Sequence, residues 1–171
     1  MDLKRHIREI PDFPKPGILF YDISTLLKHP RAWRAAVERV AEAAREFRPD
    51  VLVGIESRGF LFAAPVALQI GTGFVMVRKV GKLPGQVVSH DYDLEYGSDT
   101  VQIGDGLIEP GQRVVLIDDL MATGGTAQAA LQLIRKVGGE PVGAVFLIEL
   151  LALHGRRRVD VPIRSVLAYD A

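Results

Sequence analysis

Apolar residues are arranged along this chain in two alternating patterns. Some segments repeat them at the spacing of a helix that buries one face, and others contain short, continuous apolar runs. The helical pattern extends from Pro30 to just before Pro49, and it returns over residues 59–70 and 124–137. Continuous runs are typical of strands buried on both faces of a sheet, and they occupy residues 51–55, 74–77, 113–117, 142–148 and 163–169. Strands that alternate with helices predict an α/β domain with a mostly parallel central sheet flanked by helices on both faces.

Two stretches follow neither pattern. After a short helix predicted over residues 2–9, three prolines between residues 11 and 16 predict an irregular, extended segment. Residues 80–98 contain several glycines, with polar and apolar residues alternating between them. This second stretch predicts a long loop or a loose hairpin outside the core. The chain of 171 residues otherwise has the length of one domain.

The composition excludes several classes of function. Hydrophobic residues make up 48% of the chain and charged residues 25%, with a formal net charge of zero. This balance gives no overall field that would attract nucleic acid or an anionic membrane, so local groups must bind any anionic ligand. The absence of cysteine excludes disulfides, thiolate nucleophiles and cysteine metal sites. Because there is no apolar run near about 20 residues and no apolar segment at the N-terminus, we expect a cytoplasmic protein without a membrane span or signal peptide.

The most informative stretch follows the predicted strand over residues 113–117. Asp118 and Asp119 come directly after it, and a turn of small and hydroxyl-bearing residues then leads into the predicted helix. The turn comprises Ala122, Thr123, Gly124, Gly125 and Thr126. Its backbone N–H groups would lie at a helix N-terminus, where the helix dipole favours an anion, and its glycines would let a phosphate approach closely.

Two carboxylates beside a phosphate site need a neutral or cationic group between them and the phosphate. Ribose hydroxyls are neutral donors, and Mg²⁺ is a hard cation that prefers oxygen ligands. A sugar phosphate with magnesium therefore accounts for both halves of the motif. For Gly124 and Gly125 alone, a simple turn with a helix cap is the alternative, whereas a Walker-type P-loop is excluded because no lysine follows the glycines.

This succession of strand, aspartate pair, turn and helix resembles the 5-phosphoribosyl-1-pyrophosphate motif of type I phosphoribosyltransferases. The resemblance implies that Asp118 and Asp119 bind the ribose hydroxyls and that residues 122–126 surround the 5′-phosphate. It also implies the type I phosphoribosyltransferase fold, as a single domain over residues 1–171. Within that domain we expect a small N-terminal hood over about residues 1–30 and a flexible lid loop over about residues 80–98.

Further segments extend the resemblance to adenine phosphoribosyltransferases over nearly the whole chain. The most specific are residues 56–60 (Glu-Ser-Arg-Gly-Phe), the cationic residues 78–85, and residues 94–97 (Leu-Glu-Tyr-Gly). The resemblance implies that phosphoribosyl pyrophosphate and adenine give AMP and pyrophosphate in purine salvage, and that the enzyme is a homodimer. Magnesium would bind through the pyrophosphate and ribose of the donor, without a direct protein site.

The resemblance also assigns roles at the leaving group. Arg58 would stabilise the departing pyrophosphate together with three further cations that follow the strand over residues 74–77. These cations are Arg78, Lys79 and Lys82. Glu56 and Ser57 would complete this anion-binding loop, and we expect a non-proline cis peptide bond between Ser57 and Arg58.

Four residues would hold the base by the same resemblance, namely Leu19, Phe20, Tyr21 and Met121. Family members often have arginine where this chain has Tyr21, so we expect the backbone of Tyr21, and not its phenol, to face adenine. Glu95 is the candidate for proton transfer at the base or for stabilising positive charge, once the lid has closed and excluded water.

Two other functions remain open from the sequence. Another purine base is the first alternative, although a 6-oxo purine would need a donor at O6 and no clear lysine offers one. A non-catalytic regulator that senses the same donor is the second, but the chain has no spare length for the DNA-binding domain of such proteins. Arg156, Arg157 and Arg158 form the one basic run of note, which we interpret as a solvated turn.

Overall fold

The computed structural model describes residues 1–94 and 96–170. The chain forms two compact units, Met1–Arg39 and Val40–Ala171, and the division falls inside helix α2 (Pro30–Glu46). Each unit is described by itself. Among the described residues, no helix is both long and apolar enough to cross a membrane.

The first unit contains a two-stranded antiparallel sheet. Strands β1 (Arg8–Pro11) and β2 (Leu19–Asp22) pair in register from Arg8 with Asp22 to Pro11 with Leu19. The 3₁₀ helix η1 (Leu3–His6) precedes the sheet and helix α1 (Ser24–Lys28) follows it. The helix predicted over residues 2–9 is therefore wrong for its second half, because that half pairs with β2. The proline-rich segment is the hairpin loop, as its irregular character predicted.

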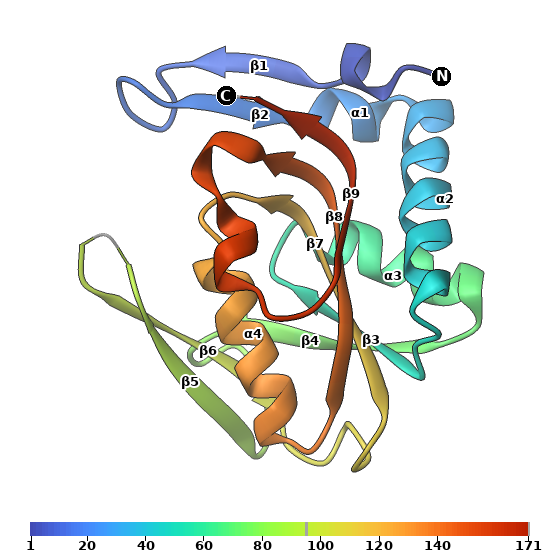
Figure 1. Cartoon of the computed structure of the whole chain (residues 1–171), viewed down its shortest axis with the longest axis vertical. Helices are drawn as coiled ribbons and strands as arrows, with labels where there is room; N and C mark the ends of the chain where they lie inside the picture. Colours follow the sequence, from blue (N-terminus) through green and yellow to red (C-terminus); the bar gives the residue numbers. More distant parts are fainter. Residues whose placement is uncertain (95, 171) are drawn as a thin grey trace. The chain divides into compact units, whose positions relative to one another are not determined.

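The second unit is built on a seven-stranded sheet with the order β5-β6-β4-β3-β7-β8-β9 (Figure 1). Its strands are β3 (Val51–Ile55), β4 (Gly73–Lys79), β5 (Val87–Asp93), β6 (Ser98–Gly104), β7 (Arg113–Met121), β8 (Glu140–Leu150) and β9 (Ile163–Tyr169). The five strands from β4 to β9 in this order run parallel, and β6 and β5 add antiparallel strands at one edge. The mostly parallel sheet predicted from the apolar runs is confirmed.

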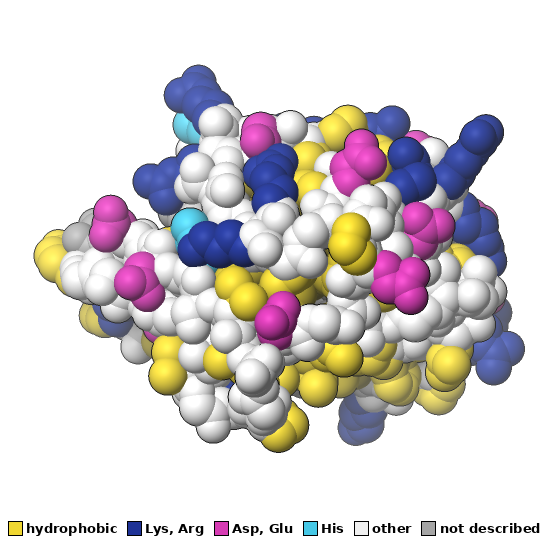
Figure 2. All heavy atoms as spheres, turned by 90° about the horizontal axis from the view of Figure 1, so that it is seen from below, with side chains coloured by type: hydrophobic (Ala, Val, Ile, Leu, Met, Phe, Trp, Pro, Cys, Tyr) yellow, Lys and Arg dark blue, Asp and Glu magenta, His cyan; other side chains and the backbone are white. Residues whose placement is uncertain are grey.

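Alternating side chains of the sheet face two different helices. Val53 and Ile55 of β3 lie in one apolar cluster with Ala130 and Ile134 of helix α4 (Gly125–Lys136). Gly54 faces the other way, toward Ala63 and Phe60 of helix α3 (Phe60–Ile70). Two short 3₁₀ helices, η2 (Leu151–Leu153) and η3 (Gly155–Arg158), connect β8 to β9. Figure 2 shows cationic and anionic side chains interspersed over one face of the molecule, as the zero net charge suggests.

Two predictions about strands need correction. The strand expected over residues 113–117 continues to Met121, because Asp118 and Leu120 pair with Phe146 and Ile148 of β8. The aspartate pair is thus part of the sheet and not of the loop after it. Of the stretch 80–98, residues 87–93 form β5, which pairs with β6 along its whole length, so the hairpin alternative holds and the alternative of one long loop is wrong.

Candidate active site

A cavity of about 420 Å³ lies where β3, β4 and β7 end. Most of the site residues predicted from the sequence line it together. They are Glu56, Ser57, Arg58, Arg78, Lys79, Asp118, Asp119, Met121, Ala122, Thr123, Gly124, Gly125 and Thr126. Apolar side chains such as Val77, Val101 and Phe146 contribute the remaining wall. Carboxyl ends of parallel strands are where α/β sheets place their ligands, so the cavity has the position expected of an active site.

The aspartate pair brings two acidic groups to this cavity with different surroundings. Asp119 is only 7% exposed, and its Oδ2 lies 2.8 Å from the Nε of Arg58. The backbone N–H of Asp119 donates to Oδ1 of Asp118 over 2.8 Å. Burial of Asp118, followed by the neighbouring carboxylate of Asp119, raises the pKa of the Asp118 carboxyl well above its ordinary value, and the charge of Arg58 offsets this only in part. A cation or several hydroxyl donors would favour the ionised form of Asp118.

The glycine turn, residues 122–126, connects β7 to α4. Gly124 precedes the helix with a φ of 86°, a left-handed conformation that favours glycine. Because the N-cap residue Gly124 has no side chain to cap the first turn of α4, the N–H groups there are available to an anion at the positive end of the helix dipole. The predicted placement of the turn, at the end of a central strand and at the start of a helix, is confirmed.

The loop after β3 is organised around Glu56. One oxygen of Glu56 accepts a very short hydrogen bond from the backbone N–H of Lys79, and the other lies 2.7 Å from Nζ of Lys82. Burial opposes ionisation of Glu56, but the hydrogen bonds from Lys82 and Lys79 and the charges of Lys82 and Arg78 outweigh it and lower the pKa. The peptide bond between Glu56 and Ser57 is cis. The prediction of a cis bond between Ser57 and Arg58 was one residue too late, because the resemblance indicated the loop and not the bond.

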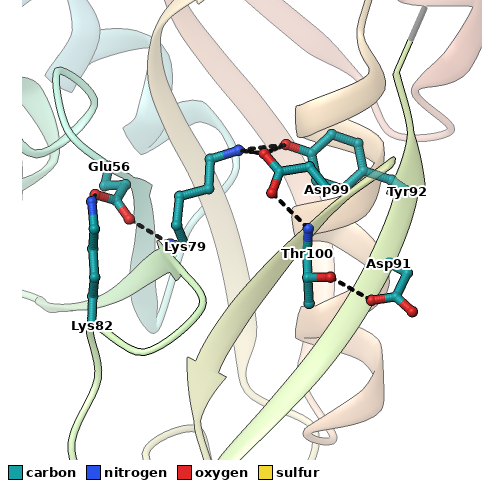
Figure 3. Close-up of polar contacts among 7 residues, drawn as sticks. All are labelled: Glu56, Lys79, Lys82, Asp91, Tyr92, Asp99 and Thr100. Carbon is teal, nitrogen blue, oxygen red and sulfur yellow. Dashed lines mark hydrogen bonds and ion pairs between the residues drawn. The ribbon is translucent and has the colours of Figure 1, made fainter. Parts of the chain in front are cut away.

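Two of the predicted cations, Lys79 and Lys82, have acidic partners, as Figure 3 shows. Nζ of Lys79 forms an ion pair with Asp99 and lies 2.8 Å from the hydroxyl of Tyr92. Both partners belong to the β5–β6 hairpin, so this lysine connects the hairpin to the cavity. The pKa of the Asp99 carboxyl is lowered, and the hydrogen bond from Lys79 is the largest cause. The hydrogen bond from Tyr92 lowers it further. Sequence reasoning missed this network, whose only signal is the spacing of polar residues along an alternating strand.

Arg78 lies on the opposite side of β4 from Lys79. Its Nη2 is 3.6 Å from Glu56, and its guanidinium is 6.0 Å from the centre of the Phe60 ring. Its Nε is buried without a hydrogen-bond partner in the structure. A buried donor of this kind is costly unless a ligand satisfies it, so Arg78 is a suitable group for binding an anion.

Four predicted residues are not among those that line this cavity, and one lies outside the described residues. Lys82 is bonded to Glu56 but does not line the cavity. Leu19, Phe20 and Tyr21 belong to β2 of the first unit. Glu95 is the residue that the structure does not describe. Their predicted roles therefore stay predictions.

The acidic groups of the cavity suit a metal ion that the protein binds together with a substrate better than one that the protein binds alone. Within residues 1–94 and 96–170, no group of three or more histidine, cysteine or acidic side chains could hold a metal ion. Asp118 and Asp119 supply carboxylates, but Asp119 is already paired with Arg58. Mg²⁺ commonly binds through one or two carboxylates while substrate phosphates and water complete its ligands. The donor set here suits that arrangement.

Comparison with known proteins agrees with this geometry. A family model of the phosphoribosyl transferase domain matches residues 22–167. The adenine phosphoribosyltransferase of Rhodospirillum centenum is 60% identical over 171 residues, covering 100% of both chains, and that of Rhodospirillum rubrum is 62% identical over the same length. The chain belongs to the adenine phosphoribosyltransferase family.

Solved structures of adenine phosphoribosyltransferases share the whole fold. The enzyme from Thermoanaerobacter pseudethanolicus has a TM-score of 0.95 at 46% identity, with 98% of each chain covered. The enzyme from Saccharomyces cerevisiae, solved with adenine and an imino-altritol bisphosphate, has a TM-score of 0.91 at 39% identity, with 97% of each chain covered. The type I phosphoribosyltransferase fold predicted from the sequence is confirmed.

Proposed function

We propose that the protein transfers the 5-phosphoribosyl group from phosphoribosyl pyrophosphate to adenine, giving AMP and pyrophosphate in purine salvage. The observation that supports this most directly is the cavity at the ends of β3, β4 and β7. It combines an aspartate pair, an uncapped helix N-terminus and several cations, in a chain 60% identical to an adenine phosphoribosyltransferase along its full length. A phosphorylated sugar with an anionic leaving group needs all three features.

The donor would be held along this cavity in three parts. The carboxylates of Asp118 and Asp119 accept hydrogen bonds from the ribose hydroxyls, and the N–H groups of the glycine turn bind the 5′-phosphate. Arg58, with the loop residues Glu56 and Ser57, faces the pyrophosphate, and Arg78, Lys79 and Lys82 surround the same end. Mg²⁺ would bind through the pyrophosphate and ribose of the donor, where it would neutralise pyrophosphate charge and aid its departure.

Loss of pyrophosphate leaves positive charge on the ribose ring. The cations stabilise the negative charge that develops on the leaving group, and the buried carboxylates lie where positive charge develops on the sugar. Leu19, Phe20, Tyr21 and Met121 orient adenine behind C1′, so that its ring nitrogen attacks as the leaving group departs. Residues 80–98 act as the lid that excludes water, and Glu95 assists the base by accepting its proton or stabilising its charge.

We also propose that the enzyme is a cytoplasmic homodimer. Leu61 and Leu68 of α3 and Met76 of β4 are exposed, and Leu68 is 85% accessible in the single chain. Exposed apolar side chains grouped on neighbouring elements are typical of an oligomer interface. The proposed donor is a highly charged sugar that does not cross a bilayer unaided, which supports a cytoplasmic enzyme.

The decisive experiment supplies the protein with phosphoribosyl pyrophosphate, Mg²⁺ and one purine base at a time. We expect AMP and pyrophosphate from adenine, and at most traces of nucleotide from hypoxanthine, guanine or xanthine. The matched control is the double variant Asp118→Asn, Asp119→Asn, which keeps the shape of the site and removes the two carboxylates of the aspartate pair. Nucleotide from a 6-oxo purine would change the proposed base, and donor binding without any nucleotide would indicate a sensor.

The same assay tests the base pocket. We expect Tyr21→Arg to keep adenine as the preferred base, because the backbone at this position would face the purine. A change of preferred base in this variant would show that the side chain at position 21 selects the base.

A further inference from the structure

The segment η3 (Gly155–Arg158) lies directly against the glycine turn. A Cβ on Gly124 would collide with the carbonyl oxygen of Gly155, and a Cβ on Gly155 would lie 2.5 Å from the carbonyl oxygen of Ala122 and 2.8 Å from Sδ of Met121. The two backbones therefore pack on each other with no side chain between them. Because Gly124 and Gly125 have no side chains of their own to fix the turn, the backbone of η3 supplies a rigid wall behind it.

An ion pair between the half-exposed Arg156 and a buried carboxylate connects η3 to the sheet. Glu149 of β8 is only 4% exposed and stands in register with Met121, the last residue of β7 before the turn. Arg156 donates to it through Nε over 2.6 Å and through Nη2 over 2.8 Å, and Ser165 of β9 donates to it over 2.5 Å. Bidentate pairs between arginine and carboxylate restrict both side chains, because two parallel bonds define an orientation as well as a distance.

All three arginines of the basic run are exposed, as the interpretation of a solvated turn predicted. Arg156 differs from Arg157 in that its guanidinium also reaches the buried carboxylate of Glu149 beside the turn. Burial opposes ionisation of Glu149, but the hydrogen bonds from Arg156 and Ser165 and the charge of Arg156 outweigh it and lower the pKa. The pair is thus ionised when the enzyme works.

We propose that Arg156 is a positioning residue for the 5′-phosphate of the donor. Through Glu149 it holds Gly155 against residues 122–124, and this contact sets where the N–H groups of the turn point. The inference rests on the proposed function, since it names the residue that shapes one part of that donor site. It makes donor binding the property that depends most on Arg156.

The test compares variants that loosen η3 with variants that do not. Arg156→Lys keeps the charge but loses the bidentate geometry, and Arg156→Met combined with Glu149→Gln removes both charges without leaving a buried charge unpaired. Gly155→Ala displaces η3 while keeping both residues of the ion pair. Arg157→Met removes the neighbouring positive charge, and Gly139→Ala introduces a comparable clash with Ile134 at the other end of β8.

Steady-state kinetics and calorimetry with ribose 5-phosphate provide the readouts. We expect the KM for phosphoribosyl pyrophosphate and the Kd for ribose 5-phosphate to rise about tenfold or more in all three η3 variants, because small displacements of binding groups are costly. The KM for adenine should stay within about twofold in the two Arg156 variants, and both KM values should stay within about twofold in the Arg157 and Gly139 controls.

A purely structural role for Arg156 gives a different result. The melting temperature and the active fraction would then fall in the Arg156 variants, with the donor KM and the Kd for ribose 5-phosphate unchanged, and this outcome would overturn the proposal. If wild-type protein formed no AMP, the proposed function would fail. The calorimetric comparison would still decide whether Arg156 positions the turn.

Discussion

Lys79 and Asp99 form an ion pair on the diagonal of the β4–β6 ladder, where Lys79 stands directly opposite Val101. One member lines the donor cavity and the other belongs to the hairpin that follows. The ammonium group that would meet pyrophosphate is therefore already engaged by a carboxylate before the donor arrives. Asp99 and the donor compete for the same cation.

Asp99→Asn should consequently strengthen donor binding. We expect the KM for phosphoribosyl pyrophosphate to fall about two- to fivefold at low salt, the scale set by a partly exposed ion pair. The gain should shrink at high ionic strength, because salt screens such charges. Asp91→Asn is the matched control, since Asp91 lies on the same hairpin and accepts a hydrogen bond from Thr100 instead. A raised donor KM in Asp99→Asn would show that Asp99 positions Lys79 for the donor.

Asp118→Asn should make the unliganded protein more stable while lowering its activity. The pKa of Asp118 is raised in the folded state, so between its ordinary value and the raised one only the unfolded chain ionises. Stability is lost as pH rises through that interval, and asparagine removes the loss. At pH 7 we expect a melting temperature higher by about 3 °C, which corresponds to about 1 kcal/mol in a chain of this length.

The pH dependence of this gain provides its test. Melting curves from about pH 2.5 to pH 8 should show the difference between Asp118→Asn and wild type vanishing at the acidic end, well below the ordinary pKa of 3.8, where the carboxyl is protonated in both states. Asp119→Asn should instead lower the melting temperature at pH 7, because it removes the partner of Arg58. A variant Asp118→Asn that is less stable than wild type at every pH would contradict the burial argument.

Gly59→Ala should disable the site through a single methyl group. A Cβ at this position would collide with the carbonyl oxygen of Ile55 and lie 2.8 Å from Oδ1 of Asp118. The carboxylate would have to move, so we expect kcat/KM for the donor to fall about a hundredfold. Gly73→Ala in β4 is the control, because a Cβ there meets nothing within 4 Å. Near-normal turnover in Gly59→Ala would mean that the position of Asp118 does not matter.

Glu95→Gln separates a catalytic role from a structural one. Loss of a general acid or base lowers kcat by about a hundredfold or more, and we expect that result with a nearly unchanged melting temperature. If Glu95 only orders the hairpin, the variant should melt earlier and turn over almost normally. That second result would remove Glu95 from the catalytic residues and leave the aspartate pair in place.

Long apolar runs made most of the second unit predictable. The strands β3 and β9 occur at the predicted residues, because continuous apolar runs bounded by turn residues have few alternatives inside a parallel sheet. β6 was missed because Val101 and Ile103 alternate with Thr100 and Gln102, and an edge hairpin buries only one side of such a strand. The end of β7 was missed because pairing with β8 outweighs the low strand propensity of two aspartates.

The parts of the site that could be predicted are those whose residues follow one another in the sequence. The aspartate pair and the glycine turn could be found because one strand, one turn and one helix contain them all. The ion pair of Glu149 and Arg156 joins separate segments, so only its burial reveals it. A single acid in the apolar run of β8 was nevertheless a signal, since a buried carboxylate requires a cationic partner.

The extension of β7 to Met121 has a consequence for how the donor site adapts. Hydrogen bonds to β8 on one side fix the aspartate pair before any ligand binds, so these carboxylates lose little conformational freedom on binding. Their backbone amides should exchange slowly with solvent, in contrast to amides of the loop after β3. Selection for a different sugar phosphate would therefore change the loops that surround the aspartate pair. The position of the pair itself would stay the same, because the sheet fixes it.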